Sequence, residues 1–171
     1  MIKLSNAVPA DAELLAKLGR QAFFEAFGVY NDPQDMQAYL DKSFDPDFIR
    51  IQLTDDTVSY VIAYFDEVAA GYSKIKRNNA PPELQGNNCM QLERIYALQA
   101  FLGKKVGSSL MKNCIDAANK ESYDHLWLGV WQQNDRAIAF YKQWGFTIIG
   151  TKQFIIGKEV NDDFVMSLAL K

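Results

Sequence analysis

The 171-residue sequence has few of the residues that build metal sites and disulfide frameworks. It contains one histidine and two cysteines, and Cys89 and Cys114 are 25 positions apart without a CxxC or Cys/His cluster. Zinc sites and disulfide scaffolds both need closer or more numerous cysteines. We therefore expect no metal ion, two inert thiols and a reducing compartment.

Long apolar runs and an excess of one charge are also missing. No stretch approaches the roughly 18 apolar residues that cross a bilayer. Pro9 and Asp11 interrupt the N-terminal segment too early for a signal peptide. The 18 Lys and Arg against 21 Asp and Glu give a net charge of −3, which offers no basic surface to a phosphodiester backbone. We expect a cytoplasmic protein without membrane or nucleic-acid partners.

The composition is that of one globular domain. Hydrophobic residues make up 49% of the chain and charged residues 23%, and the length suits a single core. No segment is rich enough in Gly, Ser or Pro to act as a linker. We expect residues 1–171 to form one domain.

The apolar periodicity predicts an α/β fold. Strands are expected at 2–8, 57–65, 68–77, 89–98, 125–131, 146–157 and 162–170. Helices are expected from Pro9, from 31–35, and at 48–53, 103–120 and 134–145, with a loop at 77–88. The strand–helix–strand–helix order of 89–145 favours a parallel strand pair with a right-handed crossover.

The junction FLGKKVGSSL, residues 101–110, connects a predicted strand to a predicted helix. The first turn of a helix has unpaired backbone N–H groups, which bind phosphate where small residues let the ligand approach. The small and cationic residues here are Gly103, Lys104, Lys105, Gly107, Ser108 and Ser109. Their spacing matches neither GxxxxGK[ST] nor GxGxxG. Taken alone, the junction is either a phosphate site or an ordinary loop.

The segment WLGVWQQNDRAIAFYKQWGF, residues 127–146, forms the second motif. Asn134 suits the N-cap of a helix and Gly145 its C-terminal glycine. Tyr141 falls on the inner face of that helix, where it is either a core aromatic residue or a functional one.

Together the two motifs resemble the GNAT superfamily of acetyl-coenzyme A dependent N-acetyltransferases. The segment LERIYALQAFLGKKVGSSLM is similar to the family's strand, pyrophosphate loop and helix, and NDRAIAFYKQWGF to its N-x-x-A-x-x-F-Y-x-x-x-G-F helix. With DMQAYLDKSF, these segments most resemble bacterial PaiA-type spermidine/spermine acetyltransferases. The loop departs from the family pattern, because Leu102 and Lys105 stand where a polar residue and a glycine are usual, while Gly107 is kept.

The resemblance implies a single-domain GNAT fold. Its central sheet is mixed and mostly antiparallel, with six to seven strands and about four flanking helices, and a splayed parallel strand pair holds the cofactor. The implied activity is transfer of acetyl from acetyl-CoA to a primary amine of a small polyamine such as spermidine or spermine, by direct attack on the thioester. The alternatives are acetylation of a protein N-terminus or lysine, and a CoA-binding regulatory module with weak catalysis. A homodimer is also implied.

The resemblance also implies roles for individual residues. The expected cofactor-binding residues are Ile95, Tyr96, Ala97, Gly103, Lys104, Lys105, Val106, Gly107, Ser108, Ser109, Asn134 and Tyr141. Tyr141 is the expected general acid, and a backbone N–H of Tyr96 or Ala97 would stabilise the oxyanion. Glu93 is the expected base, with partial burial raising its pKa; a water chain, or a structural role beside Arg94, is the alternative.

Acidic residues on the early helices are the candidates for binding a polycationic acceptor. They are Glu25, Asp32, Asp35 and Asp41, with Glu25 first because it follows two phenylalanines near a helix end. Solvated helix-face and capping charges are the alternative reading of these four. His125, the one histidine, lies outside both motifs.

Overall fold

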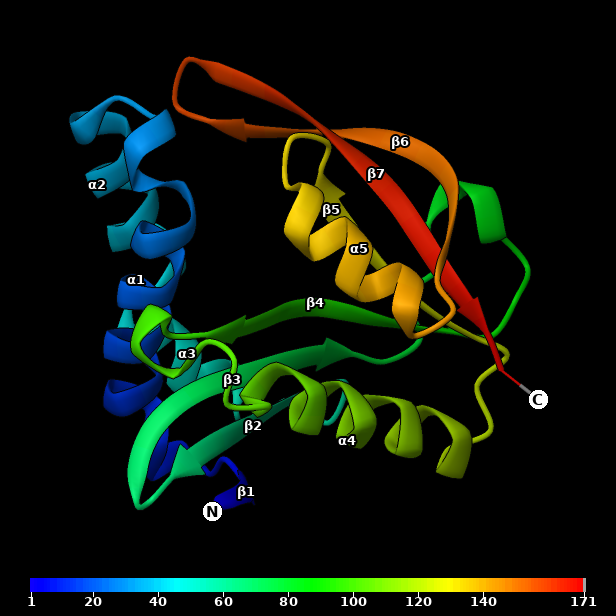
Figure 1. The fold of residues 1–171 in the computed structure, drawn as a ribbon, viewed down its shortest axis with the longest axis horizontal. Helices are drawn as coiled ribbons and strands as arrows, with labels where there is room; N and C mark the ends of the chain where they lie inside the picture. The colour runs from blue at the N-terminus through cyan, green and yellow to red at the C-terminus, as the bar shows by residue number, and fades with distance from the viewer. Residues whose placement is uncertain (171) are drawn as a thin grey trace.

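The computed structural model describes residues 1–170, in which one seven-stranded sheet runs in the order β1-β2-β3-β4-β5-β7-β6 (Figure 1). The strands are β1 (Ile2–Asn6), β2 (Val58–Phe65), β3 (Val68–Lys76), β4 (Cys89–Ala97), β5 (His125–Trp131), β6 (Thr147–Ile156) and β7 (Glu159–Ala169). Only β4 and β5 pair in parallel; the other neighbours are antiparallel. The mixed, mostly antiparallel sheet predicted from the sequence is confirmed.

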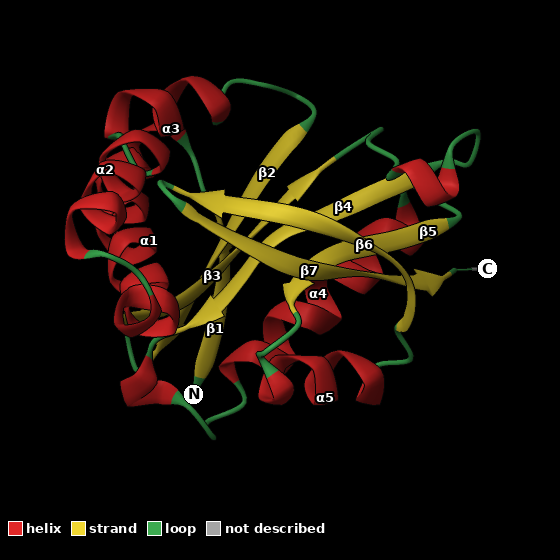
Figure 2. Ribbon diagram, turned by 90° about the horizontal axis from the view of Figure 1, so that it is seen from above, coloured by secondary structure: helices red, strands yellow, loops and turns green. Residues whose placement is uncertain are grey.

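Five α-helices flank the sheet. They are α1 (Ala12–Phe27), α2 (Pro33–Ser43), α3 (Pro46–Gln52), α4 (Val106–Lys120) and α5 (Asp135–Gln143). Figure 2 shows α1, α2 and α3 together on one side of the molecule, away from α4 and α5. The core is divided in the same way, because α1 to α3 pack on one face of β2 and β3, whereas α4 packs on their other face and, with α5, on β4 and β5.

Local sequence signals set most element ends. Asp32 precedes Pro33, and its carboxylate accepts the backbone N–H groups of the first turn of α2, as an N-cap residue does. Asp66 and Glu67 both have positive φ, which is the backbone of a tight hairpin turn between β2 and β3.

Two helix ends differ from the sequence expectation because of left-handed residues. The helix expected from residue 103 begins at Val106, since Gly103 has a φ of +79° and Lys105 a φ of +66°. The helix expected to end at Gly145 ends at Gln143, and Gly145, with a φ of +97°, follows the C-cap. These conformations cannot continue a right-handed helix.

The parallel strands β4 and β5 separate soon after they pair. Cys89, Met90 and Gln91 pair with β5, and no pairing follows although β4 continues to Ala97. On its other edge β4 pairs with β3 as far as Ala97, but the register shifts so that Glu93 is an extra residue. Such a bulge bends a strand and increases its twist. The predicted splayed parallel pair is confirmed (Figure 1).

Gly71 on β3 lies where the end of β4 meets the start of α4. A Cβ atom at Gly71 would collide with the carbonyl oxygen of Tyr96 and lie 3.0 Å from Cγ1 of Val106 and 3.1 Å from Cα of Ala97. Two of these atoms are backbone, so they cannot rotate away. The strand end and the helix must therefore move to admit any side chain.

We predict that Gly71→Ala lowers the free energy of unfolding by about 1–3 kcal/mol, as overpacking does. Urea denaturation of the two proteins measures the difference. Gly107→Ala is the matched control, because a Cβ at Gly107 meets no atom closer than 3.7 Å. Equal stability of the two variants would contradict the close approach described here.

Candidate functional site

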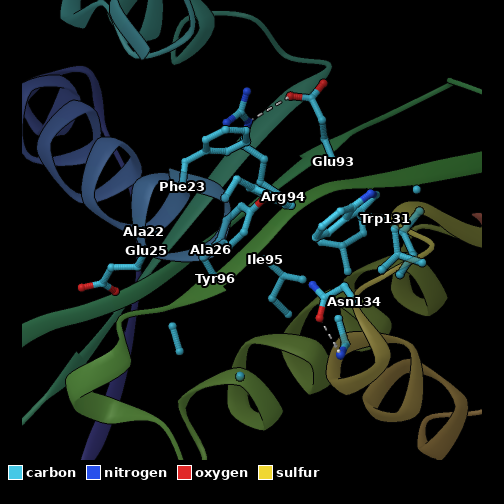
Figure 3. Close-up of a pocket in the computed structure, with 18 of the residues that line it drawn as sticks. Ala22, Phe23, Glu25, Ala26, Glu93, Arg94, Ile95, Tyr96, Trp131 and Asn134 are labelled. Atoms are coloured by element: carbon cyan, nitrogen blue, oxygen red, sulfur yellow. Dashed lines mark hydrogen bonds and ion pairs between the residues drawn. The ribbon is translucent and has the colours of Figure 1, made fainter. Parts of the chain in front are cut away.

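A cavity of about 970 Å³ opens where β4 and β5 separate. Residues of α1 to α3, β3 to β7, the first turn of α4 and one side of α5 line it. Figure 3 shows Ile95 of β4 and Asn134 at the start of α5 at one end of this space, and Glu25 of α1 at the other. The cavity therefore joins the helical pair α4 and α5 to the helical group α1 to α3.

The first turn of α4 forms one end of the cavity. Val106, Gly107 and Ser108 line it, and their backbone N–H groups have no partner within the helix because of their position in the first turn. Ser109 does not line the cavity, and its N–H donates to the carbonyl of Lys105 at 3.0 Å. This end presents amide donors and a positive helix terminus to an anion.

The two lysines of the loop have different surroundings. Lys105 lines the cavity in a left-handed conformation, which the glycine usual at this position adopts more easily. Lys104 does not line it, and its ammonium lies 5.3 Å from the centre of the Phe65 ring. Gly103 also lines the cavity.

The end of β4 forms the wall opposite α5. Ile95, Tyr96 and Ala97 line the cavity and pair with β3, so the edge of β4 that faces β5 is free of strand partners at these residues. Backbone N–H and C=O groups along such an edge are available to a ligand.

Asn134 and Tyr141 come from the two ends of α5. The side chain of Asn134 accepts the backbone N–H of Ala137 at 3.2 Å, which confirms the predicted N-cap. Tyr141 is 9% exposed and lines the cavity, and among residues 1–170 no group hydrogen-bonds to its hydroxyl. Burial raises the pKa of Tyr141 far above its usual value, so the phenol keeps its proton at physiological pH.

Glu93 has a different environment from the one expected. Burial by itself would raise its pKa, but the ammonium of Lys74 lies 2.5 Å from its carboxylate, and Arg94 and Lys76 lie within 4 Å. Together these cations hold the pKa of Glu93 below its ordinary value. The expectation of a raised pKa is therefore wrong: burial is the largest single influence, but the charge and hydrogen bond of Lys74, with the charges of Arg94 and Lys76, together outweigh it.

Asp163 on β7 is a cavity residue that the sequence analysis missed. Its side chain is buried, and burial raises its pKa to about 6 although Lys152, directly opposite on β6, counteracts the shift. No salt bridge within residues 1–170 holds this carboxylate. The alternation along β7, which places Asp163 on the same face as buried Val165 and Ser167, was the available signal.

The acidic residues of the early helices do not gather at the cavity. Glu25 lines it, and its carboxylate accepts the backbone N–H of Gln99 at 2.9 Å. The other three lie elsewhere: Asp32 caps α2, Asp35 accepts the backbone N–H of Lys158, and Asp41 pairs with Arg20. Of the four acidic candidates, Glu25 therefore lines the cavity, and the other three are capping or surface charges.

Family comparisons agree with this geometry. Residues 20–146 match the model of the acetyltransferase (GNAT) family, and this segment is well over half of the chain. The chain belongs to the GNAT family of acetyltransferases. It is a GNAT-family N-acetyltransferase, and acetyl-CoA, from which this family takes the acetyl group, is its cosubstrate.

Individual relatives cover almost the whole chain. An uncharacterized N-acetyltransferase in the pepI 3′ region of Lactobacillus delbrueckii subsp. lactis is 28% identical over 99% of this chain and 98% of its own. An uncharacterized N-acetyltransferase of Mycobacterium tuberculosis is 28% identical over 91% and 96%. The crystal structure of the PaiA N-acetyltransferase from Thermoplasma acidophilum in complex with coenzyme A has a TM-score of 0.81, at 17% identity over 99% of both chains. This likeness confirms the GNAT fold.

The residues at the α4 end of the cavity fit the phosphates of acetyl-CoA. The amides of the first turn are free of intrahelical partners, Gly107 puts no side chain over them, and Lys105 adds a positive charge. Within residues 1–170, no group of three His, Cys, Asp or Glu residues is close enough to hold a metal ion.

We predict that Lys105→Ala raises the Kd for acetyl-CoA about threefold or more at low ionic strength, because it removes a cation at the phosphate end of the cavity. Calorimetric titration at two salt concentrations measures the effect, which should shrink at high salt. Lys104→Ala is the matched control and should change the Kd less than twofold, since that side chain lies outside the cavity. An equal loss in both variants would contradict the assignment of Lys105.

Proposed function

We propose that this N-acetyltransferase moves acetyl onto a primary amine of a small molecule, by direct attack of the amine on the thioester. The observation that carries the proposal is one cavity that runs from the phosphate-binding turn of α4, past the gap between β4 and β5, to carboxylates on the side of α1 to α3. Such a cavity allows both reactants to meet without a covalent acyl-enzyme.

Cofactor-binding roles follow the geometry of the cavity. In our proposal the amides of Val106, Gly107 and Ser108 hold the pyrophosphate, and the free edge at Ile95 and Ala97 pairs with the pantetheine arm. Acetyl-CoA supplies an activated thioester. A backbone N–H of Tyr96 or Ala97 donates to the acetyl oxygen as it gains negative charge.

The acceptor amine must lose a proton before it attacks. Aliphatic amines have pKa values of about 10 and are protonated at neutral pH. Two carboxylates in the cavity can take the proton, Glu93 and Asp163. We propose Asp163, because a base works best when its pKa is close to the working pH. The ion pair of Glu93 with Lys74 makes that carboxylate the weaker base.

Tyr141 is the proposed general acid. Its phenol is protonated, reaches the cavity and has no competing hydrogen bond. It can therefore donate a proton to the departing thiolate; the corresponding thiol has a pKa of about 8.5.

The sequence leaves three readings of what the protein acts on: two classes of acceptor, and a regulator with little catalysis. The resemblance to PaiA-type enzymes favours a polyamine such as spermidine, for which Glu25 would be the contact of the second amine. A protein N-terminus or lysine is the alternative acceptor, and a CoA-binding regulator would release little thiol with either. Thiol release on adding spermidine supports the polyamine, release only on adding a peptide library supports the protein acceptor, and little release with either supports the regulator.

We propose a cytoplasmic setting for the enzyme, as expected from the sequence. No helix in the described part of the chain is long and apolar enough to cross a membrane. Cys89 and Cys114 are free and buried, which supports the expected cytoplasmic setting. A homodimer, implied by the family resemblance, is tested by light scattering.

We predict that Tyr141→Phe lowers kcat at least about tenfold and changes the Kd for acetyl-CoA less than twofold, since it removes only the proton donor. Steady-state kinetics with thiol detection and calorimetric titration measure the two quantities. Thermal unfolding checks the fold, which should be retained because the hydroxyl has no partner in the protein. Full activity in this variant would remove Tyr141 from the mechanism.

The pKa of Asp163 predicts the pH profile. Protonated Asp163 cannot accept a proton, so kcat/KM should rise with pH through about pH 6 and then level off. In Asp163→Asn we expect kcat/KM at pH 7 to fall about a hundredfold. It should then rise continuously toward alkaline pH, because a growing fraction of the amine is already deprotonated and needs no base. Glu93→Gln should keep the limb near pH 6. If Glu93→Gln removes that limb and Asp163→Asn keeps it, Glu93 is the base.

A further inference from the structure

Three cations surround one carboxylate on the acceptor side of the cavity. We call Lys74, Lys76 and Arg94 the cationic cluster; all three line the cavity beside Glu93. Lys74 is 2.5 Å from Glu93, Arg94 is 3.7 Å away, and Lys76 is 3.9 Å away. Since one negative charge faces three positive ones, the cluster and Glu93 together carry a net charge of +2.

The bulge in β4 creates this arrangement. The register shift makes Glu93 an extra residue, and Arg94 then lies directly opposite Lys74 on β3. In Figure 3 the guanidinium of Arg94 and the carboxylate of Glu93 lie next to each other. A regular strand would have placed adjacent side chains on opposite faces.

Arg94 has hydrogen-bonding capacity that the protein does not use. Its guanidinium lies 4.5 Å from the centre of the Phe44 ring, and its Nη1 atom is buried without a hydrogen-bond partner. The Tyr72 hydroxyl, beside Arg94, is also buried and has no well-aligned hydrogen bond among residues 1–170. The contact of Arg94 with Glu93, at 3.7 Å, is too long for a hydrogen bond. Buried charged donors normally have partners, because burying them unpaired is costly.

The remaining charges of the cavity do not neutralise the cluster. The carboxylate of Glu25 is used by Gln99 and Gln21, and Asp163 faces Lys152 across the sheet. Over the whole lining, six Lys and Arg side chains stand against three carboxylates. A polyamine carries only positive charges and would meet like charge at the cluster, which disfavours its binding.

We propose that the acceptor is a small amine that also carries a carboxylate, of the amino-acid class, with the carboxylate held by Arg94 beside Lys74 and Lys76. The inference rests on the proposed function and names its substrate class. A guanidinium binds a carboxylate through two parallel hydrogen bonds, which use the free donors of Arg94. Burial lowers the pKa of Lys74, whereas Arg94 stays charged at any physiological pH and is the fixed anchor.

The test compares lysine with cadaverine, which differ only by one carboxylate. In the wild-type enzyme we expect kcat/KM for lysine to exceed that for cadaverine and for spermidine at least about tenfold. Arg94→Gln should bring the lysine-to-cadaverine ratio close to one, mainly through the KM for lysine, and Arg94→Lys should restore part of it. Thermal stabilisation by CoA checks that each variant folds.

Two further variants keep the test independent of the packing of Arg94 on Phe44. Lys76→Gln changes a side chain that is 41% exposed and should reduce the lysine preference by a smaller factor. Arg50→Gln is the matched control on the surface of α3, where Arg50 pairs with Asp47, and should leave the ratio unchanged. Calorimetric titration of lysine into the CoA-bound protein gives a readout that needs no turnover.

The outcomes separate this inference from the proposed function. Equal or better turnover of spermidine or cadaverine, or a ratio that Arg94→Gln leaves intact, overturns the carboxylate acceptor while acetyl transfer stands. Lysine binding that depends on Arg94, without thiol release from any amine, supports the carboxylate site and overturns the proposed acetyl transfer. Absence of lysine binding by calorimetry, together with no lysine turnover, overturns the carboxylate site.

Discussion

The separation of β4 from β5 is the constraint on which the rest of the molecule depends. Parallel pairing stops after Gln91, so the backbone groups at the end of β4 give up a strand partner that a continuous sheet would provide. Unpaired backbone groups inside a protein are costly, and they are tolerated where a ligand can pair with them. The gap therefore weakens the sheet where we propose that acetyl-CoA binds, and the close contact of Gly71 with Tyr96 and Ala97 keeps that strand end in position.

The bulge at Glu93 connects this constraint to the charges of the acceptor side. By adding one residue to β4, it brings Glu93 and Arg94 onto the face that already carries Lys74. The same ion pair then has two effects. It offsets part of the cost of burying Lys74, and it helps to hold the pKa of Glu93 low, whereas burial raises the pKa of Asp163 to about 6. In our proposal the ion-paired Glu93 belongs to the charged cluster and Asp163 is the base, a division expected when environments move two pKa values apart.

Most of the fold could be predicted from the sequence, because the signals are local. Periodicity gave the strand and helix order, and Asn134 and Gly145 mark the ends of α5 through capping. The site was predicted less completely, since its electrostatics depend on residues far apart in the chain. The partner of Glu93 is Lys74, which only the β3–β4 register and the bulge bring near. Likewise, the different directions of Lys104 and Lys105 follow from a left-handed residue in the loop, which no propensity of lysine predicts.

Aromatic side chains that pack against the cationic cluster strengthen its electrostatic interactions relative to those of surface charges. Phe44 lies against the Arg94 guanidinium, and buried Tyr72 lies behind it, so water is largely excluded from one side of the cation. Coulomb interactions increase as the local dielectric constant falls, and a ligand carboxylate there would be attracted more strongly than at the exposed ion pairs of α2 and α3. For the same reason, an ammonium group there would be repelled more strongly than at the surface. The geometry that makes Arg94 costly to leave unpaired would therefore also make it selective, and in our proposal the choice of acceptor follows from the packing of one bulged strand.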